Sequence, residues 1–403
     1  VAILASVSTL IIVLSLVLMP VMGITGVGIA ILTGQSVVAA VLLVLHADWL
    51  PHPIVGPLAN LRNAGLLRRV APDALATLSP DPARRWQVIS RLHGRSDTAI
   101  ALVGADAQHL ALLKVVDSPD GCVELARERD ALTALHADDR LGEWRELIPR
   151  VLGANERNGA YCLLETNLPG RDARSLLAVP DERERFVAVA LAALAELQRR
   201  TARVVRGDEM ILDRWVWQPA ARVRAVTSAR LAPGLDRLVE TLSEQLLDRR
   251  VCVGWVHGDF SADNILLDAS GKLTGVVDWG QANHEGLVMA DTMTLMLATE
   301  LEATGQELGQ VVLRWLTAGT AATRASMGSI QRGLGGDQLD GRAVLLLGWL
   351  HMVAGNLAKS PRYAANPVWM RTNVRAVLRS LADGEAAAPR PRSGVDRDQG
   401  AWQ

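Results

Sequence analysis

Lysine is almost absent from this chain. Only three of its 403 residues are lysines, Lys114, Lys272 and Lys359, and arginine supplies nearly all the remaining positive charge. The two side chains differ in shape and hydration, so a lysine in a chain that otherwise uses arginine indicates a chemical requirement. Lys114 is the candidate, because leucines and valines flank it in an apolar run. Lys272 closes a polar turn and is expected to be solvated.

The number of cysteines and the net charge are also low, and each value excludes classes of function. Cys122, Cys162 and Cys252 are widely spaced, form no CxxC pair and lie among apolar residues. We therefore expect reduced core thiols of a cytosolic domain, not disulfides or metal ligands. The formal net charge is −1, which gives no field that would indicate a nucleic-acid partner.

Residues 1–46 contain no Asp, Glu, Lys or Arg. Two apolar runs, Ala2–Met19 and Ile24–Leu45, are each long enough to cross a bilayer core of about 30 Å, and Pro20 and Gly23 separate them. The sequence therefore predicts two transmembrane helices that form a hairpin over residues 1–48. A buried core hairpin is the alternative. A secretory signal peptide is disfavoured, because no basic leading region and no cleavage site precede the second run.

The flanks of this hairpin predict its orientation and a partner. Arg62, Arg68 and Arg69 follow the second run, so the positive-inside rule places the rest of the chain in the cytoplasm. The segment Gly23–Ala30 resembles the closing helices of flippases for polysaccharide or lipid-linked sugar, which implies a fused or associated transporter. Residues 49–82 are expected to form a juxtamembrane linker with a short helix over Leu58–Val70.

One stretch carries the pattern that phosphoryl transfer requires. Two apolar strands enclose a polar turn with Asp259 and, five residues later, Asn264, and a further strand ends at Asp278. In phosphoryl transfer one carboxylate takes the proton of the acceptor hydroxyl, while an Asn and a second carboxylate hold the metal ions that bridge the nucleotide phosphates. The spacing therefore predicts Asp259 as the base and Asn264 and Asp278 as metal ligands. His257 is expected to orient the turn by hydrogen bonds.

The residues before this stretch are expected to bind the nucleotide. Three strands and a helix are predicted, over Trp86–Leu92, Ala99–Val103, His109–Val116 and Glu124–Leu135. The loop after the first strand contains Gly94 and Ser96, and its backbone N–H groups would cover the phosphates that Lys114 contacts. An ordinary hairpin turn is the alternative for this loop. Glu128 lies where an ion pair to Lys114 would be expected, with Glu124 as the alternative partner.

A hinge and a helical lobe are expected to follow. Two more strands are predicted over Ile148–Leu152 and Tyr161–Glu165, and the break at residues 166–170 would be a hinge, where backbone groups from Glu165 to Asn167 meet the adenine. Apolar periodicity predicts helices over Asp181–Arg200, Leu231–Leu247, Thr292–Glu302, Leu308–Leu316, Arg342–Leu357 and Val368–Leu381. Asp291 is expected as an N-cap. Residues 384–403 are expected to be disordered.

With these residues in place, the chain resembles the aminoglycoside phosphotransferase family, the choline-kinase-like branch of the protein-kinase fold, from about residue 86 to 381. The resemblance rests on the segment His257-Gly258-Asp259, where protein kinases have His-Arg-Asp, together with the Asn and Asp described above. It implies these roles: catalytic base for Asp259, magnesium ligands for Asn264 and Asp278, phosphate contact for Lys114, its partner for Glu128, and loop support for Asp291. Val288 stands where the family usually has a proline.

The resemblance also implies an α+β, two-lobed protein-kinase-like fold, with a small β-rich lobe and a large, mostly helical lobe, preceded by the two transmembrane helices. The expected domains are the hairpin at 1–48, the linker at 49–82, the nucleotide-binding lobe at 83–167, the catalytic and substrate lobe at 168–383, and the tail at 384–403.

The expected function is a membrane-anchored phosphotransferase that uses ATP and Mg²⁺ and phosphorylates a hydroxyl group of a small molecule. A sugar, an amino alcohol and an aminoglycoside-like compound all stay open as acceptors. Asp213, Asp263 and Glu285 are candidate carboxylates for a cationic acceptor, with ordinary surface positions as the alternative. The second hypothesis is a nucleotide-binding regulatory module of a membrane transporter. A protein kinase is disfavoured, because no Ala-Pro-Glu segment follows Asp278.

Overall fold

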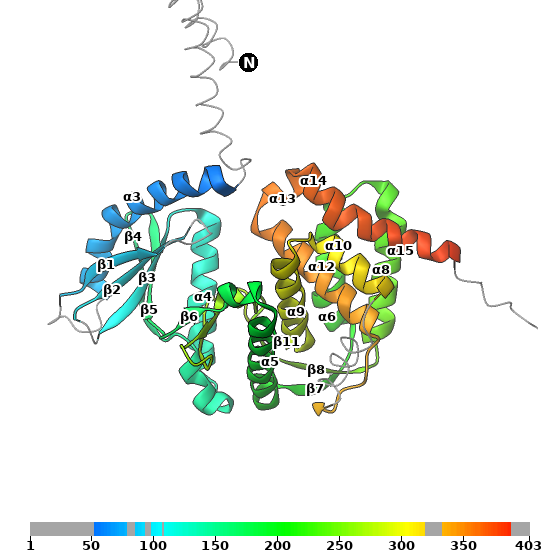
Figure 1. Cartoon of the computed structure of the whole chain (residues 1–403), viewed down its shortest axis with the longest axis horizontal. Helices are drawn as coiled ribbons and strands as arrows, with labels where there is room; N and C mark the ends of the chain where they lie inside the picture. The colour runs from blue at the N-terminus through cyan, green and yellow to red at the C-terminus, as the bar shows by residue number, and fades with distance from the viewer. Residues whose placement is uncertain (1–51, 79–84, 93–97, 107–108, 319–332, 388–403) are drawn as a thin grey trace, which may run out of the picture.

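The computed structural model of the protein describes residues 52–78, 85–92, 98–106, 109–318 and 333–387. They form two lobes that lie side by side in Figure 1, one built around a β-sheet and a larger, mostly helical one. The predicted α+β, two-lobed architecture is confirmed. The hairpin predicted over residues 1–48 and residues 388–403 of the predicted tail lie outside the described residues. None of the helices in the described part is both long and apolar enough to cross a bilayer.

The small lobe is an antiparallel five-stranded sheet in the order β1-β2-β3-β5-β4. Its strands are β1 (Gln87–Leu92), β2 (Ala99–Gly104), β3 (Leu110–Val116), β4 (Val151–Arg157) and β5 (Ala160–Thr166). Helix α3 (His52–Leu78) lies across one side of the sheet (Figure 1). Its buried residues from Leu66 to Leu78 share a core with Ala101, Leu113 and Leu164. The segment expected as a linker therefore forms a longer helix that closes this core.

The other side of the sheet faces helix α4 (Pro119–Ala137). Leu125 of α4 packs with Val116 of β3 and Leu163 of β5. Successive side chains of a strand point to opposite faces of its sheet. Lys114, two residues before Val116, therefore lies on the same side, under α4.

Most predicted strands and helices are present, with shifts at their ends. The fourth strand begins at Val151 instead of Ile148. Pro149 has no N–H for the ladder, and Ile148 is buried at the end of the 3₁₀ segment η2 (Asp139–Leu147).

The last helix runs to Ala387, so residues 384–387 are helical and not part of a disordered tail. Alanine and glutamate there are good helix formers. The domain boundaries stay a prediction.

The large lobe contains two small antiparallel sheets, in the orders β10-β9-β6 and β11-β8-β7. The strands are β6 (Arg171–Asp172), β7 (Arg203–Arg206), β8 (Arg250–Val256), β9 (Ile265–Leu267), β10 (Leu273–Val276) and β11 (Asn283–Leu287). The helical segments are η3 (Arg174–Ala178), α5 (Pro180–Thr201), α6 (Glu209–Leu212), η4 (Asp213–Trp217), α7 (Gln218–Ala225), η5 (Ala229–Leu231), α8 (Ala232–Leu246), η6 (Ala262–Asn264), α9 (Met289–Thr304), α10 (Leu308–Ala318), α12 (Gly341–Lys359), α13 (Pro361–Ala365), α14 (Pro367–Trp369), η7 (Met370–Arg375) and α15 (Ala376–Ala387). Strands β8, β9 and β10 thus bring residues 257–264 and 278 to one place.

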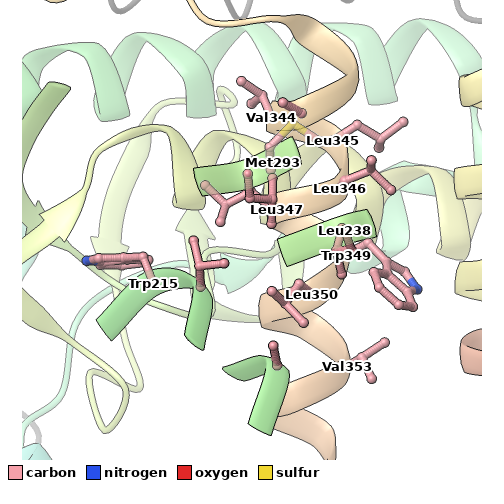
Figure 2. Close-up of a cluster of buried hydrophobic side chains, with 14 of the residues drawn as sticks. Trp215, Leu238, Met293, Val344, Leu345, Leu346, Leu347, Trp349, Leu350 and Val353 are labelled. Atoms are coloured by element: carbon pink, nitrogen blue, oxygen red, sulfur yellow. The ribbon is translucent and has the colours of Figure 1, made fainter. Parts of the chain in front are cut away.

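Helix α12 forms the centre of the large lobe's core (Figure 2). Its residues from Ala343 to Leu350 are all buried, as expected for a helix that is hydrophobic all round. At Gly348 it approaches α9 so closely that a Cβ would lie 2.7 Å from the Cβ of Met293. Figure 2 draws Met293 among the α12 side chains. This contact fixes α12 against the first turns of α9, where Asp291 lies.

Candidate active site

One buried carboxylate holds the loop that follows β8. The backbone N–H groups of His257 and Gly258 donate to the two carboxylate oxygens of Asp291, over 2.6 and 2.8 Å. Asp291 lies in the first turn of α9 and is buried, whereas Val288 occupies the N-cap position. The N-cap role expected for Asp291 is therefore wrong, and the loop support that the resemblance implied is confirmed. Charge-assisted hydrogen bonds to consecutive amides fix the direction in which the next residue, Asp259, leaves the loop.

His257 joins this loop to the strand that leads to Asp278. Its Nδ1 accepts the N–H of Asp259 over 3.2 Å, and its Nε2 lies 2.9 Å from the carbonyl oxygen of Val277. A ring nitrogen that accepts carries no proton, so we assign the proton to Nε2, which donates to Val277. The buried ring packs against Trp279, with the ring centroids 4.6 Å apart. The orienting role expected for His257 is confirmed.

Gly258 occupies a position that has no room for a side chain. Its φ is +84°, in the left-handed region that favours glycine. A Cβ on this residue would lie 2.4 Å from the carbonyl oxygen of Gln281. The His-Gly-Asp sequence is therefore required by the close passage of the chain that follows Asp278.

Asn264 and Asp278 present oxygen atoms suited to a metal ion. The side-chain N–H₂ of Asn264 donates to the carbonyl oxygen of Asp259 over 2.9 Å, which leaves its Oδ1 without a hydrogen bond to any described residue. Asp278 has a left-handed φ of +67°, a strained conformation for a residue with a side chain. Its exposed carboxylate likewise forms no hydrogen bond or ion pair with the described part of the chain.

These two groups fit Mg²⁺, which takes oxygen ligands and is commonly held by one or two protein side chains together with water and substrate phosphates. In the described residues no cluster of three or more His, Cys, Asp or Glu side chains forms a complete metal cage. The pair therefore suits an ion that arrives with a nucleotide. The metal-binding roles of Asn264 and Asp278 stay a prediction.

Asp259 is half-buried among these groups. Burial raises the pKa of its carboxyl group, the positive charge of Lys359 opposes this shift, and the negative charge of Asp278 adds to it. A raised pKa makes the carboxylate a better proton acceptor near neutral pH. Asp278 acts electrostatically on both Asp259 and Lys114. The structure therefore brings the predicted residues of the two lobes into one site, and their catalytic roles stay predictions.

Lys114 is buried between two carboxylates. Its Nζ donates to Oε1 of Glu128 over 2.6 Å and lies 2.9 Å from Oε1 of Glu165. Desolvation alone would lower the pKa of Lys114, but the nearby carboxylates raise it above its ordinary value, so the lysine stays charged. The predicted ion pair between Lys114 and Glu128 is confirmed. The alternative partner, Glu124, instead accepts a hydrogen bond from Nε2 of Gln281 over 3.3 Å.

The side chain of Glu165 was missed by the sequence analysis, which expected only its backbone to be used. This residue is completely buried near the end of β5. The register pairs Lys114 with Leu163 and Leu112 with Glu165. Lys114 and Glu165 are therefore diagonal neighbours on one side of the sheet, within reach of long side chains. A glutamate at the end of an apolar run was the available signal, but it became informative only with the register.

Three other predicted nucleotide contacts are not placed as fully. Gly94 and Ser96 lie outside the described residues, in the segment 93–97. The strands on either side of them, β1 and β2, pair antiparallel next to β3. Asn167 comes directly after β5 and is partly buried, at the start of the connection to the large lobe. The nucleotide-binding roles of these residues stay predictions.

Lys359 is a further residue of the site that sequence analysis missed. It is the last residue of α12. Desolvation alone would lower its pKa, but the charges of Asp259, Asp278 and Glu124 raise it above its ordinary value. The scarcity of lysine was the only signal in the sequence. Its position near the candidate residues depends on how α12 packs in the large lobe.

The carboxylates considered for a cationic acceptor have other partners. Two arginine side chains lie 2.6 and 3.4 Å from the carboxylate of Glu285, and one lies 3.4 Å from that of Asp263. Asp213 accepts a hydrogen bond from Nε2 of Gln218 over 2.7 Å. Arginines therefore compensate the charge of Glu285, whereas Asp263 shares Arg174 with Glu302 and Asp213 has a neutral hydrogen-bond partner.

Comparisons with known proteins point to one family. The model of the phosphotransferase enzyme family matches residues 87–327, more than half of the chain. This range contains the candidate residues from Lys114 to Asp291 but ends before Lys359. A search of curated proteins gave no match.

Solved structures resemble this chain at low sequence identity, and the first one described here shares its fold. A candidate aminoglycoside phosphotransferase from Ralstonia eutropha JMP134 is 15% identical, with a TM-score of 0.51, and the match covers 78% of this chain and 96% of that chain. A candidate fructosamine-3-kinase from Haemophilus somnus 129PT is 12% identical, with a TM-score of 0.48 and coverage of 80% and 99%. An aminoglycoside phosphotransferase from Streptomyces rimosus ATCC10970 is 20% identical, with a TM-score of 0.42 and coverage of 73% and 97%.

Proposed function

The chain belongs to the phosphotransferase enzyme family, and on that premise we propose that it transfers the γ-phosphoryl group of ATP to a hydroxyl group of a small molecule. The observation that carries this proposal is the frame around Asp259. Asp291 holds the two residues before Asp259, His257 accepts the backbone N–H of Asp259, and Asn264 donates to its backbone carbonyl oxygen. The negative charge of Asp278 acts on the half-buried carboxylate of the same residue. A base next to two oxygen ligands is the arrangement that phosphoryl transfer requires.

In the proposed reaction Asp259 orients the acceptor hydroxyl and takes its proton. The acceptor oxygen bonds to the γ-phosphorus while the bond to the β,γ-bridging oxygen breaks, which leaves ADP. Lys114 contacts the nucleotide phosphates, and Glu128 and Glu165 hold its ammonium group in place. Asn264 would hold Mg²⁺ together with Asp278. When bound, Mg²⁺ supplies positive charge to the phosphate oxygens.

The test is an acceptor screen with the full chain, ATP and Mg²⁺ against a panel of sugars, amino alcohols and aminoglycosides. We expect ATP consumption that depends on one acceptor class and yields a phosphorylated product. Asp259→Asn should lower kcat by about 10²–10⁴-fold, because the proton acceptor is lost, while ATP still binds. Asp181→Asn, an exposed position on α5, is the matched control. Nucleotide binding without transfer to any member of the panel would contradict the proposal.

We further propose that residues 1–48 anchor this enzyme to a membrane, with the catalytic lobes on the cytoplasmic side. The support is in the sequence alone: the uncharged stretch over 1–46 and the arginines that follow it. The full chain should sediment with membranes after an alkaline wash, and a variant without residues 1–48 should not. Release of the full chain by that wash would contradict the anchor.

A further inference from the structure

One segment of the large lobe carries positive charges without negative ones. The chain as a whole has 42 basic and 43 acidic residues, but residues 341–382 contain no Asp and no Glu. The segment comprises α12, α13, α14, η7 and the first part of α15. Its basic residues are Arg342, Lys359, Arg362, Arg371, Arg375 and Arg379. Such a separation of charge indicates a surface that meets an anionic partner.

Three of these arginines lie in a row on the outer side of a helix. Arg371, Arg375 and Arg379 are four residues apart along η7 and α15, so they share one face. All three are exposed, whereas Val374 and Leu378 pack into the core. The three arginines form no hydrogen bond and no ion pair within the described part of the chain. Their charge is therefore available to a partner.

Apolar and aromatic side chains continue this face at the start of the helix. Val368 lies three residues before Arg371 and is 57% exposed on α14. Trp369 is half-buried, and its ring packs on that of Tyr363 from α13, with the ring centroids 4.9 Å apart. Arginines beside exposed aliphatic and aromatic side chains are typical of segments that lie on a lipid bilayer. A nucleic-acid backbone would use the arginines but not the exposed valine.

The place of this face in the molecule indicates the same partner. Helices α13 and α14 lie at the upper edge of Figure 1, α15 continues from them along the outside of the large lobe, and α3 begins at the same edge. Helix α3 starts at His52, shortly after the segment proposed as the membrane anchor, and up to Pro72 it also lacks Asp and Glu. A chain that enters a membrane just before His52 would bring this edge of the molecule to the lipid surface.

We propose that the arginine face, formed by Val368, Trp369, Arg371, Arg375 and Arg379, docks on an anionic lipid bilayer. The three arginines bind the phosphate groups of the lipids, and Val368 and Trp369 enter the interfacial region. This contact goes beyond the proposed phosphotransferase activity and does not depend on it. It would fix the orientation of the large lobe on the membrane, which an anchor joined to the small lobe does not do alone.

The test measures hydrogen exchange of the full chain, reconstituted in vesicles of phosphatidylcholine or of an equal mixture with phosphatidylglycerol. We expect the amides of residues 361–369 to exchange about five- to tenfold more slowly on the anionic vesicles. The amides of α5 should exchange alike on both, and they also report folding. Molar salt should abolish the difference, because it shortens the screening length to about 3 Å.

Variants show whether the arginines cause the slower exchange. The triple variant Arg371→Gln, Arg375→Gln, Arg379→Gln should lower the ratio of docked to undocked protein about 100-fold and remove the lipid difference. Lysine at the same three positions should retain most of it, since a lipid surface responds to charge. Arg375→Gln alone should lower the ratio about fivefold, which keeps the proposal testable if the triple variant does not fold.

The matched control removes equal charge elsewhere. Arg199, Arg206 and Arg249 are exposed, in the last turn of α5, in β7 and directly before β8. Figure 1 draws β7 and β8 low in the large lobe, away from α13 and α14. The triple variant Arg199→Gln, Arg206→Gln, Arg249→Gln should keep the full lipid difference.

Equal exchange on the two lipids, or slowing that survives in the triple glutamine variant of the arginine face, would overturn the proposal. Duplex DNA that slows the same amides more than anionic vesicles at equal phosphate concentration would also overturn it, in favour of a nucleic acid. The other proposals fail separately. Release of the full chain by the alkaline wash refutes the anchor alone if added anionic vesicles still slow the exchange. An acceptor screen without transfer refutes the phosphotransferase activity alone.

Discussion

Charged residues of this site change the pKa of the Asp259 carboxyl group. Burial raises the pKa of its carboxyl group, and the positive charge of Lys359 lowers it. The ordinary pKa of an aspartate is close to 4. The pKa of Asp259 therefore lies above this ordinary value, and the charges of its neighbours change it.

The acid limb of activity should report this balance. The proposed base works only when deprotonated, so kcat/KM should fall as pH decreases through the raised pKa of the Asp259 carboxyl group. Lys359→Gln removes a charge that stabilises the carboxylate, so its acid limb should move to higher pH. Profiles of kcat/KM between pH 4 and 8 would measure both, with Lys272→Gln as control. Superimposable limbs in the wild type and Lys359→Gln would contradict the electrostatic link.

Gly258 gives a second prediction at this scale. Gly258→Ala should destabilise the protein for two reasons. Alanine disfavours a φ of +84°, and its Cβ would clash with the carbonyl oxygen of Gln281. Gly271→Ala is the matched control, since Gly271 has a φ of +83° and open space around it. We expect about 1 kcal/mol of destabilisation for the control and about 1–3 kcal/mol more for Gly258→Ala from overpacking. Urea unfolding would measure both, and equal losses would contradict the steric account.

At the scale of elements, α4 carries two glutamates one turn apart that serve different partners. Glu128 is buried against Lys114, whereas Glu124 reaches across to Gln281 in the large lobe. Residues at i and i+4 share one face of a helix. The same face of α4 therefore positions Lys114, the proposed phosphate contact, and contacts the loop after Asp278, so α4 links the two halves of the site.

Substitution of these two glutamates should separate the two contacts. Glu128→Ala leaves Lys114 with Glu165 alone, so the ammonium group should shift toward the sheet and KM for ATP should rise by about tenfold or more, which corresponds to a loss of about 1.4 kcal/mol of binding. Glu124→Ala loses one exposed hydrogen bond and should change KM for ATP less than threefold, a loss within about 1 kcal/mol. Steady-state kinetics with ATP as the varied substrate would measure both. An equal rise in the two variants would contradict the special role of Glu128.

At the scale of the whole molecule, the predicted parts of the site lie on two short segments of the sequence, one from Lys114 to Glu128 and one from His257 to Asp278. Asp259, Asn264 and Asp278 fall within one stretch whose strands and turn follow from local apolar pattern. The role of Glu165 required the register of β3 against β5. The role of Lys359 required the packing of α12 against α9. Both depend on tertiary contacts, which no local pattern contains.

Helix α3 shows the same limit for the fold. Its sequence, with prolines and scattered arginines, predicts a linker with a short helix over Leu58–Val70, because nothing local indicates which surface the segment covers. In the structure its leucines and alanines pack on the sheet side opposite α4. The sheet is therefore covered by α3 on one side and by α4 on the other, and Lys114 and Glu165 lie on the side of α4.

The stability of the whole molecule should depend on pH through His351. This residue lies on α12, and its Nε2 is 2.8 Å from the carbonyl oxygen of Trp215, whose ring it also contacts. Burial lowers its pKa to about 4, from an ordinary value near 6.5. Between these values the unfolded chain binds one more proton than the folded protein. The neutral form of His351 therefore makes its full contribution to the free energy of unfolding above pH 6.5. This contribution, up to about 3 kcal/mol, is lost as pH falls toward 4.

His351→Gln tests this linkage, because glutamine keeps an N–H donor for Trp215 and does not titrate. The free energy of unfolding would be measured in urea at pH 7, 5.5 and 4.5 for the wild type and the variant. Other titrating groups are common to both proteins and cancel in the difference. The advantage of the wild type over His351→Gln should therefore shrink steadily as pH falls from 7 to 4.5. A difference that stays constant over this range would mean that His351 titrates alike in the folded and unfolded chains, and would contradict its burial as the cause.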